Sequence, residues 1–314
     1  MTTPDDPTRE RDRREDDVLE RIAKIVGPGS PARGELFVGD DAAILRPLVG
    51  QVVVSTDVAV AGVHLDLSLF SLSDLGYKAV AAALSDLAAM GALARALVLA
   101  VTAPPGTDLE ALHEGVAEAA AAAGCPVVGG DLSRGGELAV AVTVIGECPG
   151  AGAVRRSGAR AGDRLYVTGP LGRSAAGLRR RRAGAGLDDV LVRAHRRPRP
   201  LLAEGRAARG AGAHAMMDLS DGLGIDLHRL ADASGVGFAL ATVPVAEGAT
   251  LEEAISGGED YELLVATPDA RRLAEVFAAR GLPAPIEVGA VVADARTRTL
   301  GGRPLERRGF EHRL

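Results

Sequence analysis

The chain has 314 residues, about twice the length of a usual single domain, so two domains are expected. Hydrophobic residues make up 47% and charged residues 25%, which excludes a wholly disordered chain, and aromatic residues are only 3%. The net charge of −6 has the wrong sign for a protein held to nucleic acid by phosphate contacts, so no nucleic acid partner is expected.

The apolar pattern of the first half predicts alternating helices and strands. Residues 1–17 are mostly charged and lack apolar periodicity, which predicts a disordered tail. The apolar run 78–102 is interrupted by charged residues, so a helix followed by a buried strand fits it better than a membrane span. The helices expected here are 18–26, 73–91 and 107–123, and the strands are 52–54, 96–102, 127–128 and 138–145.

The second half continues this alternation after a segment rich in Gly, Ala and Arg over 149–162. That segment is the expected boundary between an N-terminal domain over 18–150 and a C-terminal domain over 151–314. The alternation predicts α/β or α+β domains, each with helices that cover a sheet. The strands expected here are 165–168, 238–241, 261–266 and 286–292, and the helices are 174–182, 201–209, 223–233 and 270–279.

Two residue types are scarce, and each excludes a class of protein. Cys125 and Cys148 are too few for a disulfide framework, and no stretch resembles a signal peptide, so a cytoplasmic location without a membrane partner is expected. Lys24 and Lys78 are the only lysines, and neither follows a glycine. A phosphate-binding P-loop is therefore absent, and phosphate binding would need another device.

Acidic residues gather where predicted strands end. Each of them alone is an ordinary turn residue or helix cap. Together, hard oxygen donors on several loops are the ligands that Mg²⁺ needs, especially when phosphates supply the remaining positions. Asp86 differs, because it lies among alanines and leucines, where an ionised carboxylate is destabilising unless it is paired or binds a metal. The residues concerned are Asp41, Ser55, Thr56, Asp57, Asp86, Asp131, Asp218 and Asp221.

Two glycine pairs lie beside these acids. One precedes Asp131 and the other precedes Glu259, and glycine lets a backbone approach a ligand closely or adopt positive φ. The helix expected after Ser220-Asp221-Gly222 would in addition offer N–H groups to an anion.

These blocks, in this order, resemble the thiamine-monophosphate kinases, within the superfamily of aminoimidazole ribonucleotide synthetase-like ATP-binding enzymes. The resemblance covers about residues 18–312, and the ordered set is specific although each block alone is not. Arg173 stands where family members often have Asp, and the C-terminal aromatic block around Phe310 matches only in part. The matching blocks are 39–43, 55–57, 60–64, 77–80, 84–92, 129–131, 156–158, 163, 167–169, 218–223 and 257–263.

The resemblance implies an α/β (α+β) fold of two domains. An N-terminal domain of sheet plus helices would form a homodimer, and a C-terminal α/β domain would complete the active site in the cleft between them. The implied reaction is ATP-dependent phosphorylation of thiamine monophosphate to thiamine diphosphate, by direct in-line transfer of the γ-phosphoryl group with several Mg²⁺ ions. No catalytic acid or base is expected, because the acceptor phosphate is already mostly ionised near neutral pH.

The resemblance also implies a role for each matching side chain. The implied Mg²⁺ ligands are Asp41, Ser55, Thr56, Asp57, Asp86, Asp131, Asp218 and Asp221, the implied contacts of the co-substrate ATP are Gly130, Asp131, Arg156 and Ser220, and the implied contacts of thiamine monophosphate are His64, Glu259 and Phe310.

Three alternatives remain at this point. Selenophosphate synthetases are expected to carry a reactive Cys or selenocysteine near the N-terminus, and hydrogenase-maturation dehydratases a Cys at the extreme C-terminus. Here both cysteines are mid-chain, and the sequence ends with Leu314. A non-catalytic nucleotide-binding regulator with the same fold would tolerate the loss of metal ligands, whereas the full set is present.

Overall fold

The computed structural model describes residues 15–27, 31–38 and 41–311. Most of the predicted tail, residues 1–14, lies outside this part. The chain divides into two compact units, and each is described by itself. The first unit comprises 1–47, 56–80 and 96–143, and the second comprises 48–55, 81–95 and 144–314.

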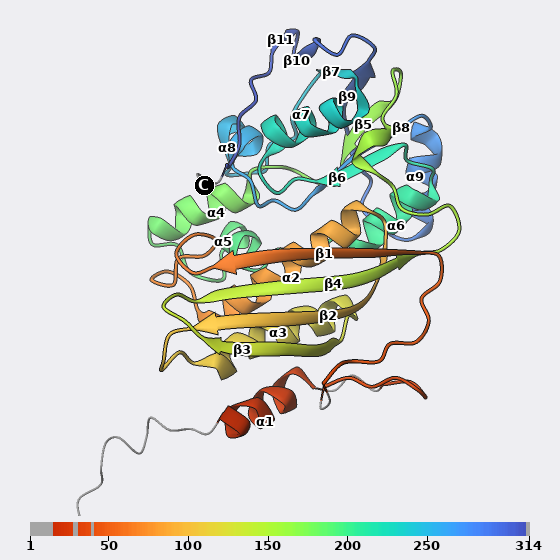
Figure 1. Cartoon of the computed structure of the whole chain (residues 1–314). Coiled ribbons are helices and arrows are strands. Elements are labelled where there is room, and N and C mark those ends of the chain that lie inside the picture. Colours follow the sequence, from red (N-terminus) through yellow and green to blue (C-terminus); the bar gives the residue numbers. More distant parts are fainter. Residues whose placement is uncertain (1–14, 28–30, 39–40, 312–314) are drawn as a thin grey trace, which may run out of the picture. The chain divides into compact units, whose positions relative to one another are not determined.

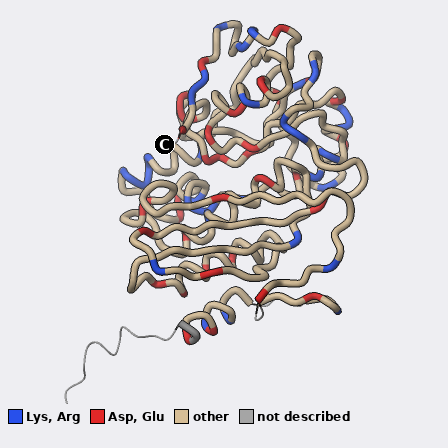
Figure 2. Tube along the Cα trace, viewed as in Figure 1, with Lys and Arg blue, Asp and Glu red and all other residues tan. Residues whose placement is uncertain are grey.

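A four-stranded sheet has the strand order β1-β4-β2-β3 (Figure 1). Strand β3 is last in this order and is therefore an edge strand, and it pairs in parallel with β2. Charged residues are sparse along these strands, as Figure 2 shows, in keeping with their Val- and Ala-rich sequences. The bounds are β1 Gln51–Val60, β2 Leu93–Ala103, β3 Val127–Arg134 and β4 Ala139–Cys148.

Three helices accompany these strands. The apolar residues of α2 that recur at helical spacing are fully buried, among them Leu75, Leu84 and Leu87. Helices α2 and α3 pack closely, since a Cβ on Gly115 would lie 1.8 Å from the carbonyl oxygen of Ser73. Helix α1 begins three residues before the predicted start at residue 18. The bounds are α1 Glu15–Val26, α2 Leu72–Ala89 and α3 Leu109–Ala123.

The second unit contains a seven-stranded sheet of order β11-β10-β7-β9-β5-β8-β6. Most neighbouring strands are antiparallel, and β10 runs parallel to β7. Buried apolar side chains such as Leu165, Phe238 and Leu264 form its core. The strands are β5 Arg164–Val167, β6 Ala215–Asp218, β7 Gly237–Leu240, β8 Leu263–Thr267, β9 Ile286–Val292, β10 Arg298–Leu300 and β11 Arg303–Pro304.

Helices of the second unit pack with one another and with this sheet. Helices α4 and α5 are neighbours, and α7 contacts both β6 and β7. The short elements α5, α8, β10 and β11 were not predicted, because they are too brief to show a clear apolar period. The bounds are η1 Arg156–Gly158, α4 Arg173–Arg182, α5 Val190–Arg196, α6 Leu202–Gly210, α7 Leu223–Ser234, α8 Leu251–Ser256 and α9 Ala270–Ala279.

Two aspartates lie inside strands, and the prediction that they follow strand ends is wrong. Strand β1 continues six residues beyond Val54 and contains Asp57, and β3 continues beyond Gly130 and contains Asp131. A side chain at position 130 would clash with β2, because a Cβ on Gly130 would lie 2.3 Å from the carbonyl oxygen of Leu99. Both aspartates therefore project from a sheet and not from a turn.

Sheets and helices occur in both units, as the α/β (α+β) prediction requires. In the described part of the chain, no helix combines the length and the apolar character needed to cross a membrane.

Candidate active site

Two carboxylates of the second unit, one half-buried and one buried, interact electrostatically. Asp86 lies on α2, and Asp218 is the last residue of β6. Burial raises the pKa of Asp218 to about 7, and the charge of Asp86 adds to this effect. Burial also raises the pKa of Asp86. Each ionised carboxylate therefore destabilises the other, as expected for like charges in a poorly solvated site.

Three neighbours partly offset this electrostatic strain. The hydroxyl of Ser85 donates a hydrogen bond of 2.6 Å to Asp218 Oδ2. The hydroxyl of Ser55 on β1 donates to Asp86 Oδ2, and that bond and the charge of Arg156 both lower the pKa of Asp86. Ser85 was not among the predicted site residues, although it directly precedes Asp86.

The loop after β6 gathers two distant segments of the chain. The N–H of Glu259 donates to the carbonyl oxygen of Ser220 at 2.7 Å. The N–H of Phe310 donates to the carbonyl oxygen of Asp221 at 2.9 Å, while its ring remains exposed. Four residues that the resemblance selected in three separate blocks, Ser220, Asp221, Glu259 and Phe310, therefore lie around one loop.

Side chains of α7 form hydrogen bonds and ion pairs at the start of this helix. The N–H groups of Asp221 and Gly222 both donate to Asp226 Oδ2 at 3.0 Å, and Arg229 forms ion pairs with Asp221 and Asp226. Burial raises the pKa of Asp226 to about 6. Two of the N–H groups expected to serve an anion, those of Asp221 and Gly222, are therefore already bonded to Asp226. The i,i+3 spacing of Asp226 and Arg229 was the available signal.

Glu259 has an unusual backbone. Its φ is +55° and that of Tyr261 is +52°, and these are the non-glycine residues with positive φ in the described part of the chain. Such conformations are destabilising and persist where the surrounding structure imposes them, often at functional sites. The Oε2 of Glu259 also lies 3.6 Å from the Nδ1 of His195 on α5.

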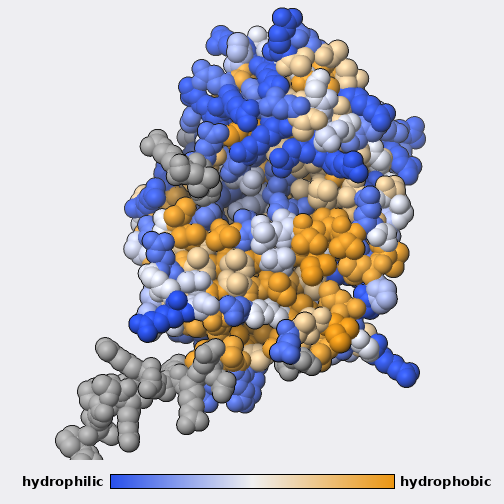
Figure 3. Space-filling model, in the orientation of Figure 1, coloured by the Kyte–Doolittle hydropathy of each residue, from blue (hydrophilic) through white to orange (hydrophobic). Residues whose placement is uncertain are grey.

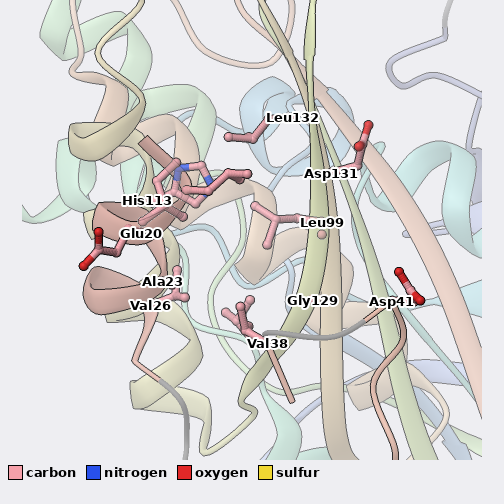
Figure 4. A pocket seen from close by; sticks show the side chains of 14 residues that line it. Glu20, Ala23, Val26, Val38, Asp41, Leu99, His113, Gly129, Asp131 and Leu132 are labelled. Carbon is pink, nitrogen blue, oxygen red and sulfur yellow. The ribbon is translucent and has the colours of Figure 1, made fainter. Parts of the chain in front are cut away.

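The first unit contains a cavity of about 620 Å³ beside β3. Gly130, Asp131 and Asp41, which the resemblance selected, line it together with apolar residues of α1 (Figure 4). The buried ring of His113 on α3 also lines the cavity, and its Nδ1 lies 2.7 Å from the carbonyl oxygen of Leu109. Burial lowers the pKa of His113, so the ring is neutral near pH 7.

The remaining predicted residues of the first unit lie on β1 and in the turn after it. The hydroxyl of Thr143 donates to that of Thr56 at 3.0 Å, and Asp57 is exposed. The Nδ1 of His64 accepts the N–H of Val60 at 3.0 Å, which fixes the orientation of the ring. The buried Lys78 donates to the carbonyl oxygen of His64, so this lysine supports the turn.

Across residues 15–27, 31–38 and 41–311, no three His, Cys, Asp or Glu side chains are grouped closely enough to hold a metal ion. The predicted ligands occur instead as the pair Asp86 and Asp218, and as Asp41 and Asp131 around the cavity. Mg²⁺ usually takes one or two carboxylates and completes its shell with water and substrate phosphates. The half-buried Asp86 and the buried Asp218, two carboxylates of like charge, fit such an ion.

Comparison with known proteins identifies the family. The description "AIR synthase related protein" matches with its N-terminal domain at residues 39–148 and with its C-terminal domain at 160–301. The thiamine-monophosphate kinase of Escherichia coli K12 is 38% identical over 301 residues, which span 88% of this chain and 92% of that protein. This chain belongs to the thiamine-monophosphate kinase family.

Solved structures agree with this assignment. The thiamine-monophosphate kinase of Stenotrophomonas maltophilia K279a superposes with a TM-score of 0.80 at 32% identity, covering 91% of this chain and 96% of that chain. AaThiL complexed with AMPPCP and TMP superposes with a TM-score of 0.75 at 27% identity, covering 99% and 100%. The resemblance, the two-domain fold and the expectation of an ATP-dependent thiamine-phosphate kinase are confirmed at the level of the thiamine-monophosphate kinase family.

Proposed function

We propose that this chain transfers the γ-phosphoryl group of ATP in line to thiamine monophosphate, giving thiamine diphosphate and ADP. Membership of the kinase family supports the reaction, and the complex of AaThiL with AMPPCP and TMP supports the substrate pair. The observation that carries the proposal is the pair of half-buried Asp86 and buried Asp218, in which the charge of Asp86 raises the pKa of Asp218, as at a site that favours a cation. No general base is needed, because the acceptor phosphate is already ionised.

Asp86 and Asp218 are the proposed centre of the Mg²⁺ site. Ser55 and Ser85 hold these carboxylates in place through hydrogen bonds. When bound, Mg²⁺ would supply positive charge that screens the repulsion between the two phosphate-bearing substrates. Arg156 adds a permanent positive charge beside Asp86. The other proposed Mg²⁺ ligands are Asp41, Thr56, Asp57, Asp131 and Asp221.

The cavity beside β3 is the proposed site of the nucleoside part of ATP. Its apolar wall and its volume of about 620 Å³ suit a flat base and a ribose. Gly130 and Asp131 of β3 both line this cavity. Figure 4 shows the Asp131 carboxylate directed away from α1. Arg156 and Ser220 are the remaining proposed ATP contacts.

His64, Glu259 and Phe310 are the proposed contacts of thiamine monophosphate. Phe310 is 46% exposed, and its aromatic side chain is suited to stacking on a ring of the substrate. The Glu259 carboxylate is suited to the positively charged thiazolium and to the amino group of the pyrimidine.

A homodimer through the four-stranded sheet is also proposed. One face of β1 carries three exposed valines, because residues separated by an even number point to the same side of a strand. They are Val52, Val54 and Val58, which are 56%, 60% and 45% exposed. Figure 3 shows a broad hydrophobic surface over this sheet. Exposed apolar surface of this extent marks interaction sites.

A cytoplasmic location is also proposed. The cysteines Cys125 and Cys148 are buried and form no disulfide, which is consistent with a reducing compartment.

The assay for this proposal follows thiamine diphosphate formed by the purified chain from ATP, Mg²⁺ and thiamine monophosphate. Product is expected with this acceptor and not with thiamine, which has no phosphate. Asp57→Asn and Asp131→Asn are expected to lower kcat by about 100-fold or more with unfolding curves close to wild type, because both side chains are exposed. Glu137→Gln, an exposed residue of the β3–β4 turn, is the matched control. No product from wild type would overturn the proposal, and unchanged rates would return both aspartates to structural roles.

A further inference from the structure

The segment around Glu259 is held against the start of α4. Asp260 is mostly buried, and its two carboxylate oxygens accept the N–H groups of Gly172 at 2.6 Å and Ser174 at 3.1 Å. On the other side, the N–H of Glu259 donates to Ser220. The backbone of Glu259 is therefore clamped from two directions, which explains how its positive φ is maintained.

The side chain of Glu259 has its own neighbours. His195 on α5 and Ser174 on α4 are both buried, and the Nδ1 of His195 lies 2.9 Å from the Ser174 hydroxyl oxygen. The same Nδ1 lies 3.6 Å from Glu259 Oε2. The nearby carboxylate favours the tautomer that carries the proton on Nδ1. Ser174 is then within hydrogen-bond distance of this N–H, and the Glu259 carboxylate is its charged neighbour at 3.6 Å.

The two helices that carry these side chains form a rigid support. Helices α4 and α5 pack against each other, and a Cβ on Gly177 of α4 would lie 2.0 Å from the carbonyl oxygen of Leu191 on α5. Asp260 ties the backbone of Ser174 to the same loop that carries Glu259. The hydrogen-bonded side chains of Ser174 and His195 are thus tied, through Asp260, to the loop whose Glu259 carboxylate lies next to His195.

We propose that Ser174 and His195 are positioning residues, which orient the Glu259 carboxylate toward thiamine monophosphate. This inference rests on the proposed role of Glu259 and extends the binding site to α4 and α5. Neither residue needs to touch the substrate, because an acceptor whose rotamers are restricted before binding loses less entropy when the ligand arrives.

The first experiment separates the two Michaelis constants. Ser174→Ala and His195→Ala are expected to raise the KM for thiamine monophosphate about tenfold, with the KM for ATP and the kcat at saturating acceptor within about twofold of wild type. His195→Asn retains a donor near the position of Nδ1 and is expected to restore most of the affinity. A purely structural role would instead change both KM values and the melting temperature together, and that result would overturn the inference.

A double-mutant cycle tests whether the histidine acts through the glutamate. If it does, the combination of His195→Ala with Glu259→Gln binds thiamine monophosphate no more weakly than Glu259→Gln alone. Calorimetric titration with thiamine monophosphate measures this without turnover. Fully additive losses would overturn the inference.

His214→Gln provides the matched control, because the Nδ1 of His214 lies 3.0 Å from Asp163 in another histidine–carboxylate pair of the second unit. This variant is expected to lose stability without a change in the KM for thiamine monophosphate. The positioning role alone would be overturned if wild type phosphorylates thiamine monophosphate and the Ser174 and His195 variants bind it as well as wild type does. Wild type that neither binds nor phosphorylates it would overturn the proposed function and, with it, this inference.

Discussion

The hydroxyl of Ser85 donates to Asp218 Oδ2 at 2.6 Å, although 133 residues separate the two in the chain. This bond joins the middle of α2 to the end of β6 inside the second unit. Both residues are buried, so neither water nor another side chain replaces the bond easily. The bond also keeps one oxygen of Asp218 in a defined position beside Asp86.

Ser85→Ala is expected to lower the free energy of unfolding by about 1–3 kcal/mol, because a buried carboxylate oxygen loses its donor. The Mg²⁺ concentration for half-maximal activity is expected to rise several-fold, because Asp218 is less well oriented. Denaturant unfolding and a Mg²⁺ titration of activity measure the two effects. Ser68→Ala removes an exposed serine–aspartate bond and should leave stability nearly unchanged. Equal Mg²⁺ dependence in Ser85→Ala and wild type would contradict the placement of Mg²⁺ at Asp218.

Gly130→Ala is expected to separate β3 from β2, because the new Cβ would lie 2.3 Å from the Leu99 carbonyl oxygen. We expect a loss of about 1–3 kcal/mol in stability and a higher KM for ATP. Gly129→Ala is the control, since its Cβ meets only a Val98 methyl group at 3.8 Å. The prediction is checked by unfolding and by ATP-dependent kinetics, and it is wrong if the two variants behave alike.

Val54→Arg is expected to convert the proposed dimer into a monomer, because it places a charge in the middle of the exposed apolar face of β1. Sedimentation velocity over a range of protein concentrations measures this change. Val190→Arg, at a hydrophobic residue that is 70% exposed on α5, should leave the oligomeric state as it is. A wild-type chain that sediments as a monomer at all concentrations would contradict the proposed dimer.

Asp260 predicts a pH dependence of stability. Burial raises its pKa to about 6, against the opposing effect of the N–H groups of Gly172, Ser174 and Arg173. The pKa in the unfolded chain is about 4, so the folded state binds this proton more tightly. The stabilisation is therefore complete below pH 4 and is lost as the pH rises through 6, by about 3 kcal/mol in all.

Unfolding of wild type and Asp260→Asn between pH 4 and pH 7 measures this effect, and the variant should show a flatter profile. Asp294→Asn is the control of opposite sign, because the backbone N–H and side chain of Arg296 lower the pKa of Asp294. Removing Asp294 should weaken the loss of stability on acidification. Parallel profiles for wild type and Asp260→Asn would contradict the burial of this charge.

The sequence by itself determined the fold class, the family and most of the long elements. Apolar periodicity identified α2, α7 and α9, since a long amphipathic segment has one face that must be buried wherever it packs. The sequence also identified the acidic blocks, because their order along the chain can be read without the structure. Strand ends and short helices such as α5 were not predicted, because their length depends on neighbouring strands and helices.

Only the tertiary structure decided which of these residues meet. It brought Asp86 beside Asp218, closed the start of α7 with Asp226, and set His195 against Glu259. Linear spacing carries no information on such contacts, because they arise when elements far apart in the chain pack together. The physical consequence is electrostatic: burial and proximity, which exist only in the folded chain, turn ordinary aspartates into a pair suited to a cation.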